Sequence, residues 1–400
     1  MKSDKTTPNV PTLRFAEFTD EWGKYELSHF VTRITRRNKN NESSLPLTIS
    51  AQYGLVDQIS FFNKTVASVD LSGYYLLYNG DFAYNKSYSN DYAWGAVKRL
   101  DKYEKGCLSS LYFVFRPNDN VDSDYLTHYF ESSKWHKGIS NIAGEGARNH
   151  GLLNMAVDDY FATKHYLPSL HEQKKIARFF NAITRRIEIQ NKIIEDLKVL
   201  KKELCNDHFK SVLHDASLRY ITLKEILTER KEYCSKDGTY THGTLSKEGV
   251  APKTERYDRD FLVKNEDKQY KVTHLNDICY NPANLKFGVI CRNTYGDLIF
   301  SPIYVTFEIS DNVYPAYIEL FLTNPNFIGR IRRYEQGTVY ERMAVSPEVF
   351  LSYETHIPAY EEQVEFANEM QCIQRKIELE TAFLSSLQNQ RRFFLNAMFI

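Results

Sequence analysis

The chain has 400 residues, of which 42% are hydrophobic and 26% are charged, and its 51 basic residues balance its 51 acidic ones. This length exceeds one ordinary domain and predicts two or three, and the composition is that of a globular protein. A net charge of zero argues against a non-specific polyanion binder, although it allows a DNA reader whose basic residues lie on one face.

Six cysteines are present, none in a CxxC pair or at zinc-finger spacing with histidine, so we expect reduced structural thiols in a metal-free, cytoplasmic protein. No signal peptide precedes the body, and no apolar run reaches 18 residues, which predicts that the chain has no membrane span. The 28 Tyr and 25 Phe favour aromatic-rich β cores over stacking on nucleic acid.

In chain order, residues 1–11 are polar and contain two prolines, which predicts a flexible lead-in. A first mixed α/β head follows over residues 12–165. Within it, the β-branched and aromatic run Leu111–Phe115 predicts a buried strand, and Tyr125–Trp135 predicts a short helix.

A long helix is expected over residues 168–213, because Pro168 favours a helix boundary and the apolar residues then recur in steps of four and three. Such spacing is typical of a coiled-coil seam. The expected seam residues are Ile176, Phe180, Ile183, Ile187, Gln190, Ile194 and Leu197, and the same steps lead on to Lys201 and Leu204.

A second head is expected over residues 214–355, with a strand at Ile303–Phe307 and a short helix at Ala316–Asn324. After Pro358, a second long helix is expected over residues 358–400. Its seam residues are Phe366, Met370, Ile373, Ile377, Glu380, Leu384 and Leu387.

The two helices match at an offset of 190 residues without a gap, including the polar seam positions Gln190 and Glu380. A single helix with an apolar stripe needs a partner, and the other copy is the nearest one. The intervening head makes an antiparallel pair natural, and this would place Gln190 beside Glu380. That polar pair either fixes the register of the helices or is merely solvated.

The heads repeat more weakly. Tyr84-Asn85 matches Tyr280-Asn281 at an offset of 196, and Ser109–Phe115 matches Ser301–Phe307 at 192. We therefore predict an α+β fold in which two α/β heads are joined by two long antiparallel coiled-coil helices, with an internal pseudo-two-fold repeat. The segments 32–70, 85–106 and 228–275 do not match, which is typical of two modules with different targets or of neutral loop drift.

No catalytic motif is convincing. The chain has no Walker A loop, and its nearest approach to an amine-methyltransferase motif, Asn281 to Asn284, lacks the second proline and the aromatic residue. Glu266 to Lys268, with Asp258 or Asp260, loosely resembles a nuclease core but lies in a polar stretch. A self-contained nuclease or methyltransferase with fused readers is therefore the alternative hypothesis, and a coiled-coil scaffold without a DNA role is a third.

Arg, Lys and Asn side chains on the heads are candidates for contacts with DNA, because Arg and Asn bind guanine and adenine edges in the major groove. A solvated surface is the simpler interpretation for any one of them. The candidates are Arg33, Arg36, Arg37, Lys39, Lys86, Ser87, Tyr88, Arg148, Asn149, His150, Asn284, Lys286, Thr338, Tyr340 and Arg342.

Several strings together resemble the DNA-specificity subunits of type I restriction–modification systems. They are PTLRFAEFTDEW from Pro11, GDFAYNKSYS from Gly80, GAVKRL from Gly95, LSSLYFVF from Leu108, and the P-x(4)-Q entry of both long helices. The end of the first helix departs from the family pattern, since Glu203 stands where glycine is usual.

This resemblance implies two target-recognition domains, each of which reads one half of a bipartite double-stranded DNA sequence, and helices that set the spacer between the halves. It also implies that two methyltransferase subunits dock on the chain, and that motor-nuclease subunits join them for cleavage. The chain itself would be non-catalytic and would bind no cofactor, because S-adenosylmethionine and adenine methylation belong to the methyltransferase subunits.

Overall fold

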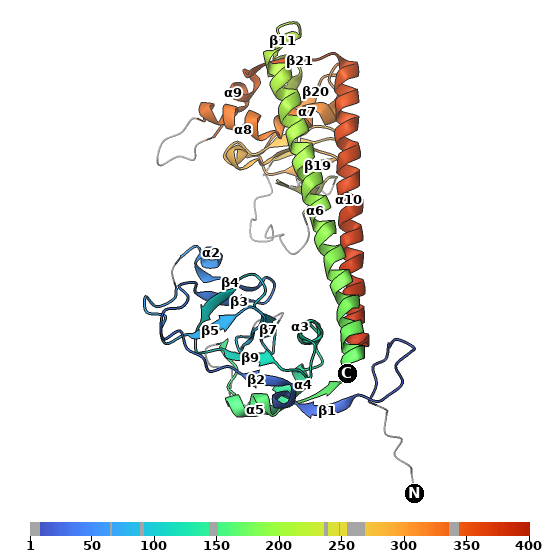
Figure 1. Ribbon diagram of the computed structural model, residues 1–400. Coiled ribbons are helices and arrows are strands. Elements are labelled where there is room, and N and C mark those ends of the chain that lie inside the picture. The colour runs from blue at the N-terminus through green and yellow to red at the C-terminus, as the bar shows by residue number, and fades with distance from the viewer. Residues whose placement is uncertain are drawn as a thin grey trace. The chain divides into compact units, whose positions relative to one another are not determined.

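The computed structural model describes residues 9–64, 66–88, 92–143, 151–235, 239–247, 249–253, 269–335 and 344–400. The chain divides into two compact units. Unit 1 comprises residues 1–191 and 382–400, and unit 2 comprises residues 192–381. In each unit, a head of strands and short helices packs on parts of two long helices (Figure 1). Among the described helices, none combines the length and apolar character that crossing a membrane requires.

The two long helices are α6 (Leu170–His214) and α10 (Tyr360–Ala397), and each begins two residues after a proline. They are antiparallel within both units. In unit 1, Phe179 of α6 packs on Phe394 of α10, whereas Arg186, further along α6, lies over Phe383, which comes earlier in α10. In unit 2, Lys201 Nζ donates to Gln374 Oε1 at 2.8 Å, whereas His208, further along α6, stacks on Phe366, which comes earlier in α10. The predicted antiparallel arrangement is confirmed.

All fourteen predicted seam residues from Ile176 to Leu387 are buried or half-buried. The prediction was wrong at Leu204, which is 40% exposed, while the neighbouring Cys205 is buried. A straight α-helix drifts by about 20° per heptad against a 3.5-residue repeat, so the inward face moves on by one residue after several heptads. The pairing of Gln190 with Glu380 stays a prediction.

In each head, the first and the last strand pair in an equivalent two-stranded antiparallel ribbon. In head 1, β1 (Gly23–Glu26) pairs with β10 (Lys164–Leu167), and in head 2, β11 (Arg219–Thr222) pairs with β21 (Glu354–Ile357). In each case the second strand leads directly into a long helix. The ribbon therefore brings the first strand of the head to the point where its helix begins.

A four-stranded sheet forms the centre of each head, with strand order β2-β9-β6-β7 in head 1 and β12-β20-β17-β18 in head 2. The equivalent strands occur in the same chain order, so the repeat seen weakly in the sequence extends to the topology. Their bounds are β2 (Val31–Arg33), β6 (Phe82–Asn85), β7 (Ala96–Arg99), β9 (Phe113–Pro117), β12 (Leu227–Glu229), β17 (Ile278–Tyr280), β18 (Ile290–Arg292) and β20 (Val305–Ile309).

The segments that differ in sequence also share one strand skeleton. In head 2, β16 pairs with β13 and β19, and β19 runs parallel to β14, which forms a hairpin with β15. In head 1, β5 pairs with β8, and β3 forms a hairpin with β4. The pairings that correspond to β13 with β16 and to β14 with β19 are each replaced by a single bridge, at Arg37 and at Pro46 respectively. The bounds are β3 (Leu47–Ser50), β4 (Gly54–Asp57), β5 (Tyr75–Tyr78), β8 (Lys105–Leu108), β13 (Tyr233–Cys234), β14 (Thr241–Ser246), β15 (Gly249–Pro252), β16 (Tyr270–Thr273) and β19 (Leu298–Phe300).

Short helices cover the sheets. Head 1 contains α1 (Leu27–Phe30), α2 (Gln58–Phe62), α3 (Ser123–Glu131), α4 (His136–Ile142) and α5 (Val157–Phe161). Head 2 contains α7 (Pro315–Leu322), α8 (Pro325–Ile331), α9 (Pro347–Leu351) and the 3₁₀ turns η2 (Leu223–Glu225), η5 (Leu285–Phe287) and η6 (Arg332–Tyr334). The helix predicted over Tyr125–Trp135 corresponds to α3, which ends earlier, at Glu131, and α4 begins only at His136.

The two predicted strands begin two residues later than expected. Leu111 and Ile303 lie in turns, each closed by a hydrogen bond from the next residue's N–H to the carbonyl of Ser109 or Ser301, and each side chain is 62% exposed.

Aromatic rings fill the cores of both heads, as the composition predicts. Tyr84 stacks on Tyr160 in head 1, and Tyr280 stacks on Phe350 in head 2, each with ring centroids 4.8 Å apart.

Gln173, from the first P-x(4)-Q motif, fastens head 1 to the start of α6. Its side chain is almost fully buried. The amide oxygen accepts the backbone N–H of Asp122, the residue that caps α3, at 2.8 Å, and the amide nitrogen donates to the carbonyl of Pro168 at 2.9 Å. One side chain therefore satisfies a donor on the head and an acceptor at the helix entry.

Gln363 makes the same two bonds in head 2. Its amide oxygen accepts the backbone N–H of Tyr314, which caps α7, and its nitrogen donates to the carbonyl of Pro358, both at 2.9 Å. The spacing between proline and glutamine is thus explained by geometry, because the glutamine must reach back by one helical turn while it faces the head.

Each head also buries an aromatic side chain from the end of a long helix. Phe399, just beyond α10, lies between Tyr125 and Phe180 in the core of head 1, with ring centroids 5.5 and 5.6 Å away. Phe209 of α6, at the equivalent position, packs 5.6 Å from Tyr317 in the core of head 2. In the described part of each unit, the cluster that contains the central sheet and the short helices is therefore shared between a head and a helix end.

We predict that Phe399→Ala destabilises unit 1 by about 3–5 kcal/mol, because it removes a buried ring and leaves a cavity. Phe393→Ala is the matched control, since that ring lies near the same end of α10 but is mostly exposed, and it should change stability by less than about 0.5 kcal/mol. Urea unfolding followed by tyrosine fluorescence measures both. Equal midpoint shifts for the two variants would contradict the shared core.

Candidate nucleic-acid interface

The predicted DNA contacts that the structure describes lie mostly toward the two ends of one strand in each head. In head 1, Asp81 precedes β6 and Lys86 follows it, so about 16 Å of extended chain separate them. In head 2, Asp277 precedes β17, and Lys286 lies in the turn after it. We name these the aspartate end and the lysine end of each head.

At the aspartate end of head 1, the buried carboxylate of Asp81 binds two arginines, one in β9 and one in the segment that follows β2. It accepts Arg116 Nε at 2.5 Å and Arg36 Nη2 at 2.8 Å, and it also accepts the backbone N–H of Tyr78 at 2.8 Å. The Arg36 guanidinium stacks 4.2 Å over the Tyr78 ring. Arg36, predicted as a DNA contact, is therefore engaged within the protein, where it compensates a buried charge.

The other predicted residues of this segment differ in their surroundings. Arg37 donates to a backbone carbonyl at 2.8 Å and stacks 4.1 Å over Tyr75. Arg33 is exposed and lies 3.8 Å from the exposed Asp158, and Lys39 is exposed. Thus two arginines of this segment support the fold, while Arg33 and Lys39 are accessible to solvent.

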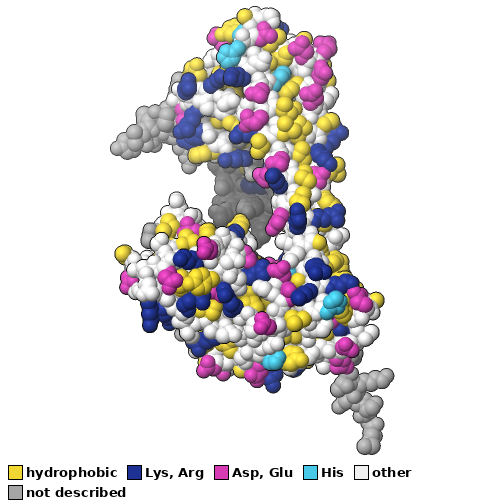
Figure 2. All heavy atoms as spheres, viewed as in Figure 1, with side chains coloured by type: hydrophobic (Ala, Val, Ile, Leu, Met, Phe, Trp, Pro, Cys, Tyr) yellow, Lys and Arg dark blue, Asp and Glu magenta, His cyan; other side chains and the backbone are white. Residues whose placement is uncertain are grey.

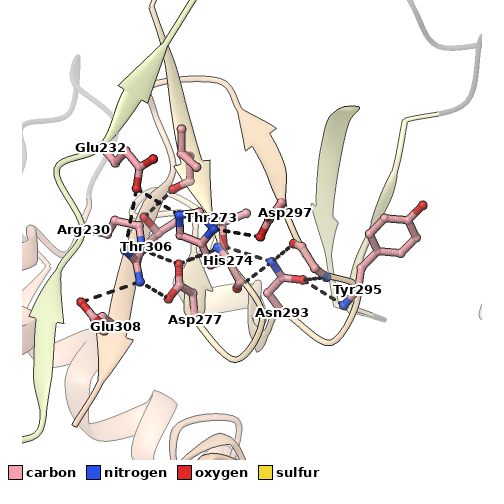
Figure 3. A network of polar contacts seen from close by, with 12 residues as sticks. Arg230, Glu232, Thr273, His274, Asp277, Asn293, Tyr295, Asp297, Thr306 and Glu308 are labelled. Atoms are coloured by element: carbon pink, nitrogen blue, oxygen red, sulfur yellow. Dashed lines mark hydrogen bonds and ion pairs between the residues drawn. The ribbon is translucent and has the colours of Figure 1, made fainter. Parts of the chain in front are cut away.

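At the aspartate end of head 2, Asp277 is held in the same way with a different partner. Its carboxylate binds Arg230 through two hydrogen bonds of 2.8 and 3.0 Å, and it accepts the backbone N–H of His274 at 2.8 Å (Figure 3). Arg230 also lies 3.7 Å from Glu308. The aspartate thus keeps its bond to the residue three positions before it, and one arginine replaces two.

His274 lies between two carboxylates from different segments of the chain. One ring nitrogen is 2.8 Å from Asp297 and the other is 3.0 Å from Glu232 (Figure 3). Burial alone would lower the pKa of His274, but the bonds to Asp297 and Glu232 outweigh it and raise that pKa above its ordinary value. The imidazolium form therefore links the two segments.

Sequence reasoning missed these two hubs. Asp81 and Asp277 match at an offset of 196, the same offset that relates the two Tyr-Asn pairs. That equivalence could have identified the two aspartates from the sequence. Their arginine partners could not be identified in this way, because Arg36 and Arg116 of head 1 have no basic equivalents in head 2.

At the lysine end of head 1, the strip after β6 pairs with a segment about 65 residues further along the chain. The carbonyl of Lys86 accepts the N–H of Leu153, and the N–H of Tyr88 donates to the carbonyl of Gly151, while Ser87 forms a bridge with Leu152. The Lys86 ammonium group lies 4.7 Å over an aromatic ring, and burial lowers its pKa. The structure thus brings residues 86–88 beside residues 151–153.

The lysine end of head 2 is built similarly. The carbonyl of Pro282 accepts the N–H of Val345, the residue equivalent to Leu153, and Asn284 and Lys286 follow at η5. Lys286 lies 5.4 Å over Phe287. The strip after the central strand therefore meets the same part of the chain in both heads.

The remaining predicted contacts lie outside the described residues. They are Arg148, Asn149, His150, Thr338, Tyr340 and Arg342, and the same holds for the acidic string Glu266 to Lys268 with Asp258 and Asp260. On the face shown in Figure 2, Lys and Arg side chains are mixed with Asp and Glu, as the balanced charge predicts. Within the described ranges, no group of three or more His, Cys, Asp or Glu is arranged to hold a metal ion.

Residues 34–199, from the end of β2 through most of α6, match the model of the type I restriction modification DNA specificity domain. The chain contains a type I restriction–modification DNA specificity domain. The comparison with curated protein sequences gives no match.

Two solved structures share the fold of the whole chain. One is a type I restriction–modification S subunit from M. genitalium, at 15% identity and a TM-score of 0.52, with 98% of this chain and 99% of that chain covered. The other comes from a study of complex assembly and conformational transition in the type I R-M system, at 14% identity and a TM-score of 0.56, with 95% and 98% covered. The specificity-domain fold thus occurs twice in this chain, once in each head.

We predict that His274 makes the stability of head 2 depend on pH. A histidine whose folded pKa is raised contributes stability that is present below about pH 6.5 and is lost as the pH rises through the folded pKa. Between about pH 6 and 8.5, the wild type should therefore lose up to about 1 kcal/mol relative to His274→Gln. Hydrogen exchange of β16 and β17 amides measures this difference, and parallel pH profiles for the two proteins would contradict it.

Proposed function

We propose that the chain is the DNA-specificity subunit of a type I restriction–modification complex and that each head reads one half of a bipartite DNA sequence. The observation that carries this proposal is the match of residues 34–199 to the specificity domain, together with a second head of the same strand framework. One framework with different side chains on it is what two half-sites of different sequence require.

The long helices would determine the distance between the half-sites. A helix of 45 residues, as in α6, is about 68 Å long and holds its length because every interior peptide is hydrogen-bonded. Two linked heads also gain effective concentration, so each half-site contact can be weak alone. On this proposal, a change of helix length alters the spacer and leaves the half-site sequences unchanged.

The helices also offer a surface for the methyltransferase subunits. Two pairs of equivalent apolar side chains are exposed on them: Ile189 and Leu379 at 52% and 68%, and Ile193 and Phe383 at 38% and 40%. Apolar residues exposed at matching positions of a duplicated helix are typical of a protein–protein interface. The duplication would provide one such surface for each of two methyltransferase subunits, and motor-nuclease subunits would join the resulting complex.

Catalysis would reside in those partners. On this proposal the lone chain neither methylates nor cuts DNA, and turnover of S-adenosylmethionine by the purified chain would overturn it. The match of residues 34–199 to a specificity domain does not favour the alternative of a self-contained nuclease or methyltransferase.

We predict that exchanging residues 12–165 for those of a related subunit changes one half of the methylated sequence and leaves the other half unchanged, because each head reads alone. Mapping of methylated adenines in cells that carry the hybrid chain with its methyltransferase measures this. The reciprocal exchange of residues 214–355 should change only the other half. A hybrid that changed both halves would rule out two independent readers.

We predict that the double variant Ile193→Asp with Leu379→Asp weakens association with the methyltransferase subunit at least tenfold, because it places charges in the proposed apolar contact. Both positions are exposed, so the fold should be retained. Gln388→Asp, a change at an exposed position of α10 outside this set, is the control and should leave association unchanged. Titration calorimetry measures both. Unaltered association of the double variant would place the docking surface elsewhere.

A further inference from the structure

The aspartate ends of the two heads carry opposite charges at equivalent positions. Arg36 of head 1 corresponds to Glu232 of head 2 at the offset of 196, and Arg116 corresponds to Glu308 at the offset of 192. Both arginines bind Asp81 directly, whereas both glutamates lie near the arginine that binds Asp277. The framework is the same, but the charge facing solvent is reversed.

The reversal is compatible with the fold because the compensating charge has moved. In head 2, Arg230 occupies the position of Ile34 in head 1 and neutralises Asp277 by itself. The glutamates are therefore not needed to hold the buried aspartate. The Glu308 side chain is 62% exposed and that of Asp297, which binds His274, is 60% exposed. This end of head 2 thus presents carboxylates to solvent.

DNA constrains which face each head can use. Two copies of one framework that read two halves of a duplex are expected to approach it with equivalent faces, because the symmetry of the protein mirrors that of the site. The phosphates of the duplex attract cations and repel exposed carboxylates. The exposed glutamates of head 2 therefore exclude its aspartate end from the phosphates, and the equivalence extends this exclusion to head 1.

We propose that each head presents its lysine end, with Lys86 in head 1 and Lys286 in head 2, to the DNA and turns its aspartate end away. This inference rests on the proposed function and adds to it the face of each head that meets the duplex. It also assigns Arg36 to the support of Asp81 instead of DNA contact. Arg36 and Arg116 are then framework residues of head 1.

The lysine ends have the chemistry that this role requires. Residues 85–88 and 281–287 contain no acidic side chain, and each strip carries one lysine beside Ser or Asn side chains. The lysines lie over Phe113 and Phe287, so their stems are held against the head. Both strips are held by backbone hydrogen bonds to Leu153 in head 1 and Val345 in head 2, which gives them a fixed position for contact with DNA.

The test compares charge changes at the two ends of head 2 in the full chain bound to its methyltransferase. Binding to a duplex that carries the mapped methylated sequence is measured over a range of salt concentrations. Lys286→Gln should make the slope of log K against log salt shallower by about 0.9, the value for one lost phosphate contact. Lys286→Arg should restore it. Lys86→Gln should have the same effect from head 1.

Glu308→Lys adds a cation at the aspartate end and should leave both slope and affinity unchanged, with Glu308→Gln as its neutral control. Glu308 is exposed and leaves the Arg230–Asp277 pair intact when replaced. If Glu308→Lys steepened the slope by about 0.9 and tightened binding, or if both Lys→Gln variants kept the wild-type slope, the inference would be overturned. A wild-type complex that did not prefer the mapped duplex over a scrambled one would instead refute the proposed function.

Discussion

The buried amides of Gln173 and Gln363 each join three parts of a unit at a single point: the cap of a head helix, the entry of a long helix and the proline that starts it. A buried donor or acceptor left without its partner costs about 1–3 kcal/mol, so an alternative seating of the head would lose stability at two groups at once. The angle between the head and the helix is thereby fixed at the start of the helix. This is where it matters most, because an angular error there displaces the helix by an amount that grows with distance along it.

The parts of the fold that repeat with a period could be predicted from the sequence. The seam residues follow the helical spacing over four heptads, and the constant offset of 190 residues relates one helix to the other position by position. Boundaries were less accessible. Leu111 and Ile303 are β-branched or aliphatic residues next to true strands, and only the turn bonds to Ser109 and Ser301 show that they lie outside them.

The candidate site was harder to predict, because polar residues in a core follow no period. Arg36 and Arg37 stand in a string of Arg, Thr and Asn that is typical of a DNA-contacting loop, yet both guanidinium groups are used within the head. Their partners, Asp81 and Tyr75, lie about 40 residues away in the sequence. Only the folded strand order brings these groups together.

The heads also show how a framework survives a change of side chains. Arg37 stacks on Tyr75 across neighbouring strands in head 1, and at the same two positions of head 2, Lys271 stacks on Tyr233. The cation and the ring have exchanged strands, and the contact remains. A contact of this kind is retained as a pair, so comparison of single positions between the heads misses it.

The core shared between head 1 and Phe399 has a consequence for synthesis of the chain. Domains generally fold in order as they leave the ribosome. Phe209 is already made when head 2 is translated, since α6 precedes that head, whereas head 1 needs Phe399, which is translated only after head 2. The domain that is made first is thus the one that is completed last, and its unfinished aromatic core stays open to solvent or chaperones until Phe399 has been made.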